Sequence, residues 1–180
     1  YHFGSKMGLL EAVFARHATG IAEERDTMLR DCRSEPGRPP LLEQIVRAFL
    51  KPGMQGQHGG SGFARFRGRM LSENTEHTRD LYALHFDDST GHFLNALQDA
   101  LPDLPAYDLQ WRFHVMLGAM VYTLANPGRI QILSDGSCDP SDPGQALDNL
   151  VPMIAQLFRN PAMPAAGTAD SLHEITTIQA

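Results

Sequence analysis

The segment from Tyr107 to Ala125 constrains the fold most, because it is apolar on nearly every side. Apolar side chains fill it throughout: Leu109, Trp111, Phe113, Val115, Met116, Leu117, Met120, Val121, Tyr122 and Leu124. A helix with almost no polar face has to be covered all round, by its own domain and by a second subunit. Gly118 lies in its middle, where glycine costs about 1 kcal/mol of helix propensity relative to alanine. We therefore expect a neighbouring helix to approach closely at Gly118.

Helical spacing of apolar residues recurs along the rest of the chain, and no segment shows sustained alternation of the kind that predicts a strand. The pattern predicts an all-α fold with further helices over residues 6–30, 41–50, 63–76, 78–101 and 144–159. Prolines and glycines separate them, and Lys51-Pro52-Gly53 should end the second helix. Gly91 should bend or split the helix at 78–101, and Pro152 should kink the last helix or leave one of its carbonyls unpaired.

The same patterns predict which side chains are buried. In the first helix Arg25 falls in a charged run on the outer side, and in the fourth Leu84 is a core candidate. Arg65, Arg67 and Arg69 read as a solvated face, although Arg65 and Arg69 are one turn apart and could hold a carboxylate or phosphate together. The glycine-rich stretch 53–62 lacks the Gly-Lys-Ser/Thr ending of a phosphate loop, which favours a flexible connection.

Composition places the chain among globular proteins. Its 180 residues can bury one substantial core, and 42% hydrophobic with 20% charged residues is ordinary for such a domain. No apolar run of about 18 residues predicts a membrane span, and no secretory signal pattern opens the sequence. Cys32 and Cys138 lack C-x-x-C spacing, so a reducing cytoplasm is the simplest compartment. The net charge of −6 argues against a surface that binds nucleic acid all over.

The first ten residues, Y-H-F-G-S-K-M-G-L-L, form the most specific motif in the chain. They resemble the Y-H-F-x-[SN]-K-x-x-L-[LF] run of the tetracycline-repressor (TetR) family of helix-turn-helix regulators. In that family the run joins the recognition helix to the helix that enters the regulatory domain. The resemblance implies that residues 1–6 end a helix-turn-helix domain lying mostly outside this chain, and that residues 7–160 form a helical domain for ligand binding and dimerisation. The net charge of −6 would then be mainly that of the regulatory domain and would say little about the DNA-binding surface.

Residues 161–180 carry a second, shorter resemblance. After a Pro/Ala/Gly linker, residues 167–180 are similar to the start of the same family's helix-turn-helix, G-x-x-x-[ST]-[LV]-x-[ED]-I. Ser171 would be the N-cap and Glu174 the matching capping-box residue. Two interpretations stay open: a displaced part of the DNA-binding domain, and an amphipathic tail that matches by chance.

The resemblance to the TetR family also implies a function. It predicts a cytoplasmic homodimer that binds double-stranded operator DNA and acts as a repressor released by a small apolar effector. His2 and Lys6 correspond to the family's phosphate-contacting positions, and Tyr1 corresponds to its aromatic residue at the end of the recognition helix. Ser171 would belong to the same DNA-binding domain. The dimer would form through the helices at 107–126 and 144–159, with these residues at the interface: Phe113, Leu117, Gly118, Val121, Leu147, Leu150, Ile154 and Phe158.

The family's effectors lie in a cavity among the regulatory helices. Here the candidate lining residues are Phe63, Phe66, Arg69, Met70, Phe86, Trp111, His114, Met116 and Tyr122. Aromatic and methionine side chains would give an adaptable apolar wall, while the arginines or His114 would fix a polar head. Residues 111–125, W-R-F-H-V-M-L-G-A-M-V-Y-T-L-A, also look like members that sense fatty-acid-like or other apolar molecules.

The sequence offers little for other chemistry. No nucleophile elbow, H-E-x-x-H or dinucleotide-binding glycine turn occurs, so we expect neither catalysis nor a cofactor. His85, Asp88 and His92 share a helical face, but such a triplet is usually coincidence, and no metal site is expected. An all-α enzyme, or a small-molecule-binding protein without a DNA function, is the alternative.

Overall fold

A computed structural model describes residues 6–33, 40–73 and 75–162, and within these ranges the chain folds entirely into helices and connecting segments. The predicted all-α fold is confirmed. The helices are α1 (Lys6–Cys32), α2 (Leu42–Met54), α3 (Ser61–Glu73), α4 (Glu76–Ala100), α5 (Ala106–Ala125), α6 (Pro127–Leu133) and α7 (Pro143–Arg159). None of the described helices is long and apolar enough to cross a membrane.

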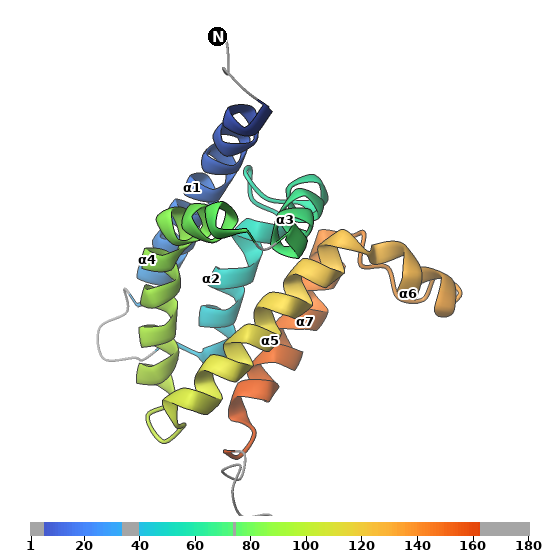
Figure 1. Ribbon diagram of the computed structural model, residues 1–180. Helices are drawn as coiled ribbons and strands as arrows, with labels where there is room; N and C mark the ends of the chain where they lie inside the picture. The colour runs from blue at the N-terminus through green and yellow to red at the C-terminus, as the bar shows by residue number, and fades with distance from the viewer. Residues whose placement is uncertain (1–5, 34–39, 74, 163–180) are drawn as a thin grey trace, which may run out of the picture.

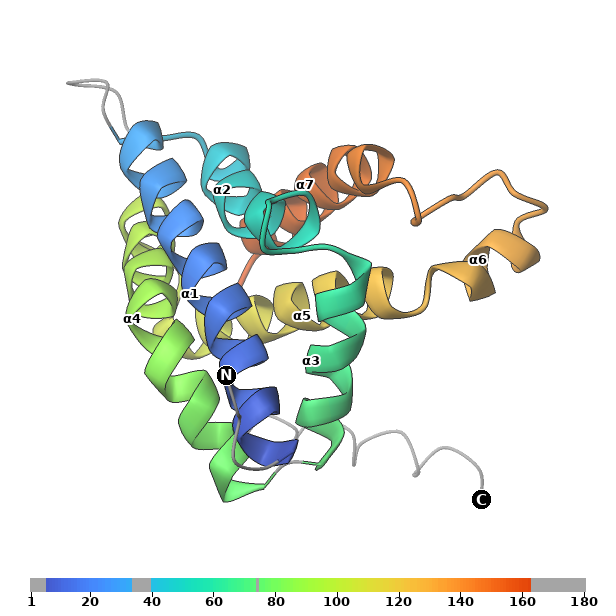
Figure 2. The same ribbon diagram turned by 90° about the horizontal axis from the view of Figure 1, so that it is seen from above.

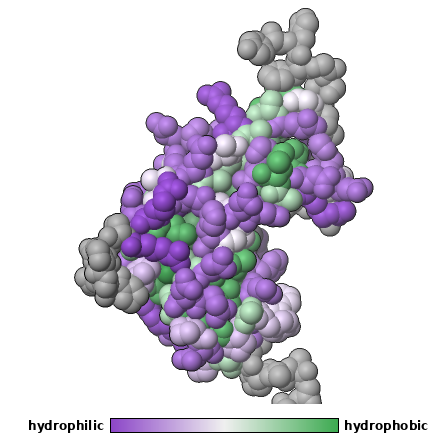
Figure 3. All heavy atoms as spheres, turned by 90° about the vertical axis from the view of Figure 1, so that its left-hand side faces the viewer, coloured by the Kyte–Doolittle hydropathy of each residue, from purple (hydrophilic) through white to green (hydrophobic). Residues whose placement is uncertain are grey.

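Helix α2 lies at the centre of the bundle. It packs against α1 on one side and α7 on the other, while α4 runs along α1 and α3 crosses α5 (Figures 1 and 2). Helix α6 and the segment that follows it extend away from this body, whereas α5 and α7 lie side by side (Figure 1). The face that carries α1 and α4 is mostly hydrophilic, with hydrophobic atoms visible only in limited patches (Figure 3).

The main hydrophobic core joins α2, α4, α5 and α7. The Phe49 ring is at its centre, edge-on to the rings of Phe93 and Phe113 at centroid distances of 5.1 and 5.0 Å. Such edge-to-face pairs add about 0.5–1.5 kcal/mol each to the energy of burying the rings.

A second, smaller core ties the N-terminal half of α1 to α3 and α4. It consists of Phe14, Ala18, Ile21, Phe63 and Phe86, all buried. Phe14 contacts the Phe63 and Phe86 rings at centroid distances of 5.9 and 6.0 Å. The beginning of α1 is therefore fixed by aromatic contacts separate from the main core.

Helix α2 does not end where its sequence predicted. It runs through Pro52 and Gly53 to Met54, and the backbone N–H of Gln55 still donates to the Lys51 carbonyl oxygen at 2.7 Å. The proline removes one helical hydrogen bond, but Pro52, Gly53 and Met54 are all buried, and this burial offsets the loss. The prediction of a helix end at residues 51–53 was wrong because it weighed local propensity without packing.

The glycine-rich connection after α2 is also more tightly held than predicted. Nδ1 of His17 lies 2.7 Å from the His58 carbonyl oxygen, and the His58 ring lies where a side chain at Gly20 would have to go. The backbone N–H of Gly60 donates to the Gly53 carbonyl oxygen at 2.9 Å, and Gly60 has a φ of 95°, a conformation that favours glycine. The connection is a packed turn against α1.

Two burial predictions were reversed. Arg25, expected on the outer side of α1, is only 1% exposed, and Leu84, a core candidate, is 76% exposed. Arg25 is buried because α2 and α4 both contact α1, and together they cover a wider arc of the α1 surface than a single apolar stripe would require. Helix α4 also continues through Gly91 without a break.

Candidate functional site

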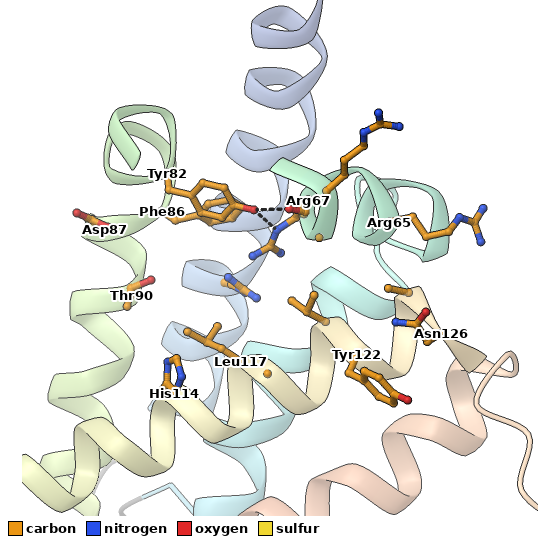
Figure 4. A pocket seen from close by; sticks show the side chains of 16 residues that line it. Arg65, Arg67, Tyr82, Phe86, Asp87, Thr90, His114, Leu117, Tyr122 and Asn126 are labelled. Atoms are coloured by element: carbon orange, nitrogen blue, oxygen red, sulfur yellow. Dashed lines mark hydrogen bonds between the residues drawn. The ribbon is translucent and has the colours of Figure 1, made fainter. Parts of the chain in front are cut away.

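A cavity of about 760 Å³ opens between α1, α3, α4 and α5 (Figure 4). Its volume is within the range of about 300–1,000 Å³ typical of small-molecule sites. Each of the four helices contributes to its lining, which comprises Arg25, Arg65, Arg67, Gly68, Arg69, Tyr82, Phe86, Asp87, Thr90, His114, Leu117, Gly118, Val121, Tyr122, Ala125 and Asn126.

Arg67 of α3 extends into the cavity from its upper side (Figure 4). The residue is 6% exposed, and its guanidinium carbon lies 4.8 Å from the centroid of the Phe86 ring and 5.5 Å from that of Tyr82. Its Nε donates to the Tyr82 hydroxyl at 3.4 Å, a long hydrogen bond. Neither terminal nitrogen of Arg67 has a hydrogen-bond partner among the described residues. Most of its donor capacity is therefore unused.

Arg25 of α1 lies at the buried end of the cavity. Its Nε donates to the Phe49 carbonyl oxygen at 2.8 Å, and its Nη2 lies 3.7 Å from the Met120 sulfur. Its guanidinium carbon is 5.7 Å from the centroid of the same Phe86 ring that Arg67 covers. Burial lowers the pKa of Arg25 well below its usual value, the charge of Arg67 lowers it further, and Asp26 partly opposes both. Because guanidinium groups stay protonated in proteins, two like charges face one cavity.

Tyr82 and the rim residues complete the polar lining. Burial raises the pKa of the Tyr82 hydroxyl, and the charge of Arg67 partly opposes that shift. Nearer to solvent, the exposed side chains of Asp87, His114 and Asn126 line the mouth. Four arginines and a single carboxylate thus line the cavity, in a chain whose net charge is −6.

The wall opposite the arginines is apolar and comes from α5. Leu117, Val121 and Ala125 line it, and Gly118 adds open space, because a Cβ built there would meet no atom within 4 Å. The expected close approach of a helix at Gly118 is absent within the described chain. The cavity thus combines a cationic end with an apolar side.

The cavity contains part of the set of pocket residues that the sequence predicted. Arg69, Phe86, His114 and Tyr122 line it. Phe63, Phe66 and Met70 belong instead to the second core or pack against it, and Met116 is buried in the main core. Trp111 is exposed on α5, with its ring 5.9 Å from that of His114. Of the arginine pair suggested as an anion clamp, Arg65 points away from Tyr82 and Phe86 (Figure 4).

Arg25 and Arg67 are the residues that sequence reasoning missed. A charged residue within a charged run predicts an outer face, and only the positions of α2 and α4 show that Arg25 is enclosed. For Arg67 there was one signal: it lies four residues after Phe63, on the face that packs in the second core.

The predicted dimer residues divide into two groups. Phe113, Leu147, Ile154 and Phe158 are buried in the chain's own main core, with at most 5% of each residue exposed. Leu117, Gly118 and Val121 line the cavity, and Leu150 is half-buried. Leu147, Ile154 and Phe158 are buried in the main core because the apolar stripe of α7 packs against α2 and α5.

The sequence also singled out DNA-binding residues and a histidine pair on α4. Tyr1, His2 and Ser171 lie outside the described residues, and Lys6 is the first residue of α1. Nδ1 of His85 lies 3.1 Å from the Thr19 hydroxyl, whereas Nδ1 of His92 lies 3.2 Å from an Asp26 carboxylate oxygen. The two histidines are thus held by different partners on α1.

An all-helical bundle around a cavity with an apolar wall and a few buried polar groups has the form of a small-molecule-binding domain. Residues 43–156 match the family model described as "Tetracyclin repressor-like, C-terminal domain". The match spans more than half of the chain, which therefore belongs to this family of transcriptional regulators. A comparison with curated proteins gave no match.

Proposed function

We propose that this protein is a homodimeric repressor that leaves its operator when a small, largely apolar effector enters the cavity between α1, α3, α4 and α5. Membership of the family supports a ligand-responsive regulator, and the size and apolar wall of the cavity support an effector of this kind. The resemblance of residues 111–125 to members that sense fatty-acid-like molecules points the same way.

One residue carries the proposed link between effector and DNA. Phe86 lines the cavity and also belongs to the second core, where its ring is edge-on to that of Phe14. Phe14 lies near the N-terminal end of α1. In the family that the chain resembles, this end of the helix is connected to the DNA-binding domain. An effector that displaces Phe86 would move the start of α1. The effector can change DNA affinity only by as much as its own affinity differs between the DNA-bound and the released arrangements.

The proposed dimer uses an exposed stripe instead of the buried residues named above. Tyr107, Trp111, Val115 and Tyr122 follow one another at intervals of four, four and seven residues on α5, and all four are exposed. This spacing places them on a single helix face. Leu150, Met153 and Leu157 form a similar, partly exposed row on neighbouring α7. Large apolar side chains in one exposed patch are typical of an interface.

The dimer is tested by sedimentation of the purified chain. Val115→Asp places a charge in the middle of the stripe and should produce a folded monomer. Leu84→Asp, on the exposed face of α4, is the matched control and should leave the dimer intact. A Val115→Asp protein that still sediments as a dimer would rule out this face.

The regulator itself is tested with the full-length protein. Duplexes selected from a random library should bind it with an affinity that falls steeply as salt rises, as phosphate contacts require. Apolar compounds are then screened for release of the selected duplex. Thr90→Leu, which adds a larger apolar side chain to the cavity lining from α4, should bind DNA but resist release, while Thr90→Ser should respond like the wild type. Failure to select any duplex, or unchanged release from Thr90→Leu, would contradict the proposal.

A further inference from the structure

Arg25 and Arg67 bring two positive charges to one cavity, and neither forms an ion pair with a carboxylate among the described residues. Both arginines are more than nine-tenths buried. Removing a charged group from water costs several kcal/mol unless an opposite charge or good hydrogen bonds offset it. Contacts with the faces of Phe49 and Phe86 offset a part of that energy.

From this arrangement we propose that the cavity binds an amphiphile with an anionic head, a carboxylate, placed between Arg67 and Arg25. The inference rests on the proposed effector role of the cavity and adds the charge and position of the effector's head group.

The unused donors favour a carboxylate. Arg67 engages only its Nε, so its two terminal nitrogens present a planar fork, which matches the two oxygens of a carboxylate. Arg25 engages Nε and Nη2, which leaves Nη1 without a hydrogen-bond partner among the described residues. The Tyr82 hydroxyl accepts from Arg67 Nε and donates to the Arg67 carbonyl oxygen at 3.5 Å, a long hydrogen bond that it could exchange for one to a bound carboxylate. Together these groups can provide charge-assisted hydrogen bonds to a bound carboxylate.

The rest of the cavity suits an apolar tail. Leu117, Val121 and Ala125 line the α5 side, and no charged group of α5 is among the lining residues. The one acidic residue in the lining, Asp87, is at the exposed rim. A molecule with its acid group between the arginines can therefore lay its hydrocarbon portion along α5.

Isothermal titration of the purified chain tests this inference with three ligands that share a tail: decanoate, 1-decanol and methyl decanoate, each fully dissolved. We expect the wild type to bind decanoate about tenfold or more tightly than either neutral compound, since hydrogen bonds to charged groups are the strong ones. This comparison needs no variant and so does not depend on how a mutant folds. Equal affinity for the alcohol and the acid, or no binding of any of the three, would overturn the inference.

Two arginine variants then locate the head group. Arg67→Met should lose the preference for decanoate while keeping binding of 1-decanol. Arg65→Met removes a lining arginine whose side chain points away from Tyr82 and Phe86, and it should keep the wild-type preference (Figure 4). A decanoate preference that survives in Arg67→Met would also overturn the inference.

The outcome is separable from that of the proposed function. If decanoate binds in the expected way but the full-length protein selects no DNA, the anion site stands and the repressor proposal fails. If DNA is selected and a neutral compound alone binds and releases it, the repressor stands and the anionic head group is rejected.

Discussion

Two different parts of Phe49 hold the guanidinium of Arg25. The guanidinium carbon lies 3.7 Å from the centroid of the Phe49 ring, and Arg25 Nε donates to the backbone carbonyl oxygen of the same residue at 2.8 Å. This pairing anchors a cation from α1 against α2, inside the main core. It explains how the Arg25 charge can remain buried although none of the described carboxylates forms an ion pair with it.

Replacing Arg25 by methionine should leave the free energy of unfolding unchanged or raise it by about 1 kcal/mol or more, because an apolar side chain of similar length removes the cost of burying the charge. Urea denaturation measures the effect. Arg25→Ala removes the same charge but leaves a void, and should be less stable than Arg25→Met by about 2 kcal/mol or more. A loss above about 2 kcal/mol in Arg25→Met would show that the cation stabilises the fold.

Phe49→Ala should destabilise the protein by about 3–5 kcal/mol, the usual range for removing a buried phenylalanine. The ring contacts Phe93 and Phe113 as well as Arg25, so neighbouring groups can fill the void only in part. The matched control is Leu84→Ala, which should change stability by less than about 0.5 kcal/mol because Leu84 is exposed. Similar effects of the two substitutions in chemical denaturation would contradict the assignment of the core.

The Arg112 side chain caps the C-terminal end of α7. Its Nη1 donates to the carbonyl oxygens of Leu157, Phe158 and Asn160, and its Nη2 donates to that of Pro161, at distances between 2.8 and 3.0 Å. Arg112→Met should lower the free energy of unfolding by about 1.5–3 kcal/mol, since charged donors to otherwise free carbonyls are lost.

Arg112→Lys keeps the charge without the fork of donors, and it should recover only part of that stability. Thermal unfolding followed by circular dichroism distinguishes the two variants. If lysine restores the wild-type midpoint fully, charge alone accounts for the effect and the fork geometry is unimportant.

Gly118→Ala should stabilise the chain by about 1 kcal/mol, the propensity difference between the two residues inside a helix. A Cβ at this position meets no atom within 4 Å, so no clash offsets the gain. Denaturation of the variant measures the difference. A lower stability would indicate that another part of the molecule, such as a second copy, packs tightly against Gly118.

The ion pair between Glu43 and Arg159 should make stability depend weakly on pH. Arg159 Nη1 lies 2.6 Å from a carboxylate oxygen of Glu43, and its hydrogen bonds lower the pKa of Glu43 below its usual value of about 4.3. A lowered pKa in the folded state gives stability that is present above pH 4.3 and is lost as pH falls through the folded-state pKa. Both side chains are partly exposed, so the effect should be at most about 1 kcal/mol.

The measurement compares the wild type with Glu43→Gln at pH 6 and at pH 3. The stability difference between the two proteins should be larger at pH 6, because protonation removes the ion pair from the wild type at low pH. The stability of Glu43→Gln should therefore depend less on pH than that of the wild type, and the stability of Arg159→Gln should show the same weaker dependence on pH. An equal difference at both pH values would show that the pair contributes nothing in solution.

Helix positions were predictable, whereas the polar end of the site was not. The apolar spacing at 107–125 and 144–159 predicted α5 and α7 closely, since an apolar stripe forms wherever a helix packs on a core. Four of the nine predicted pocket residues line the cavity. Arg25 and Arg67, the two buried arginines of the cavity, escaped prediction because a charged residue is expected in solvent unless its surroundings are known.

The sequence by itself determined that the chain is helical, where most of the helices lie, and which family its first residues resemble. These properties depend on local spacing and on short motifs. The tertiary structure alone decided that α2 continues through Pro52, that Leu84 faces solvent, and that Arg25 and Arg67 share one cavity with Phe86. Those outcomes depend on which helices meet in space, because burial and charge balance are set by neighbours distant in the sequence.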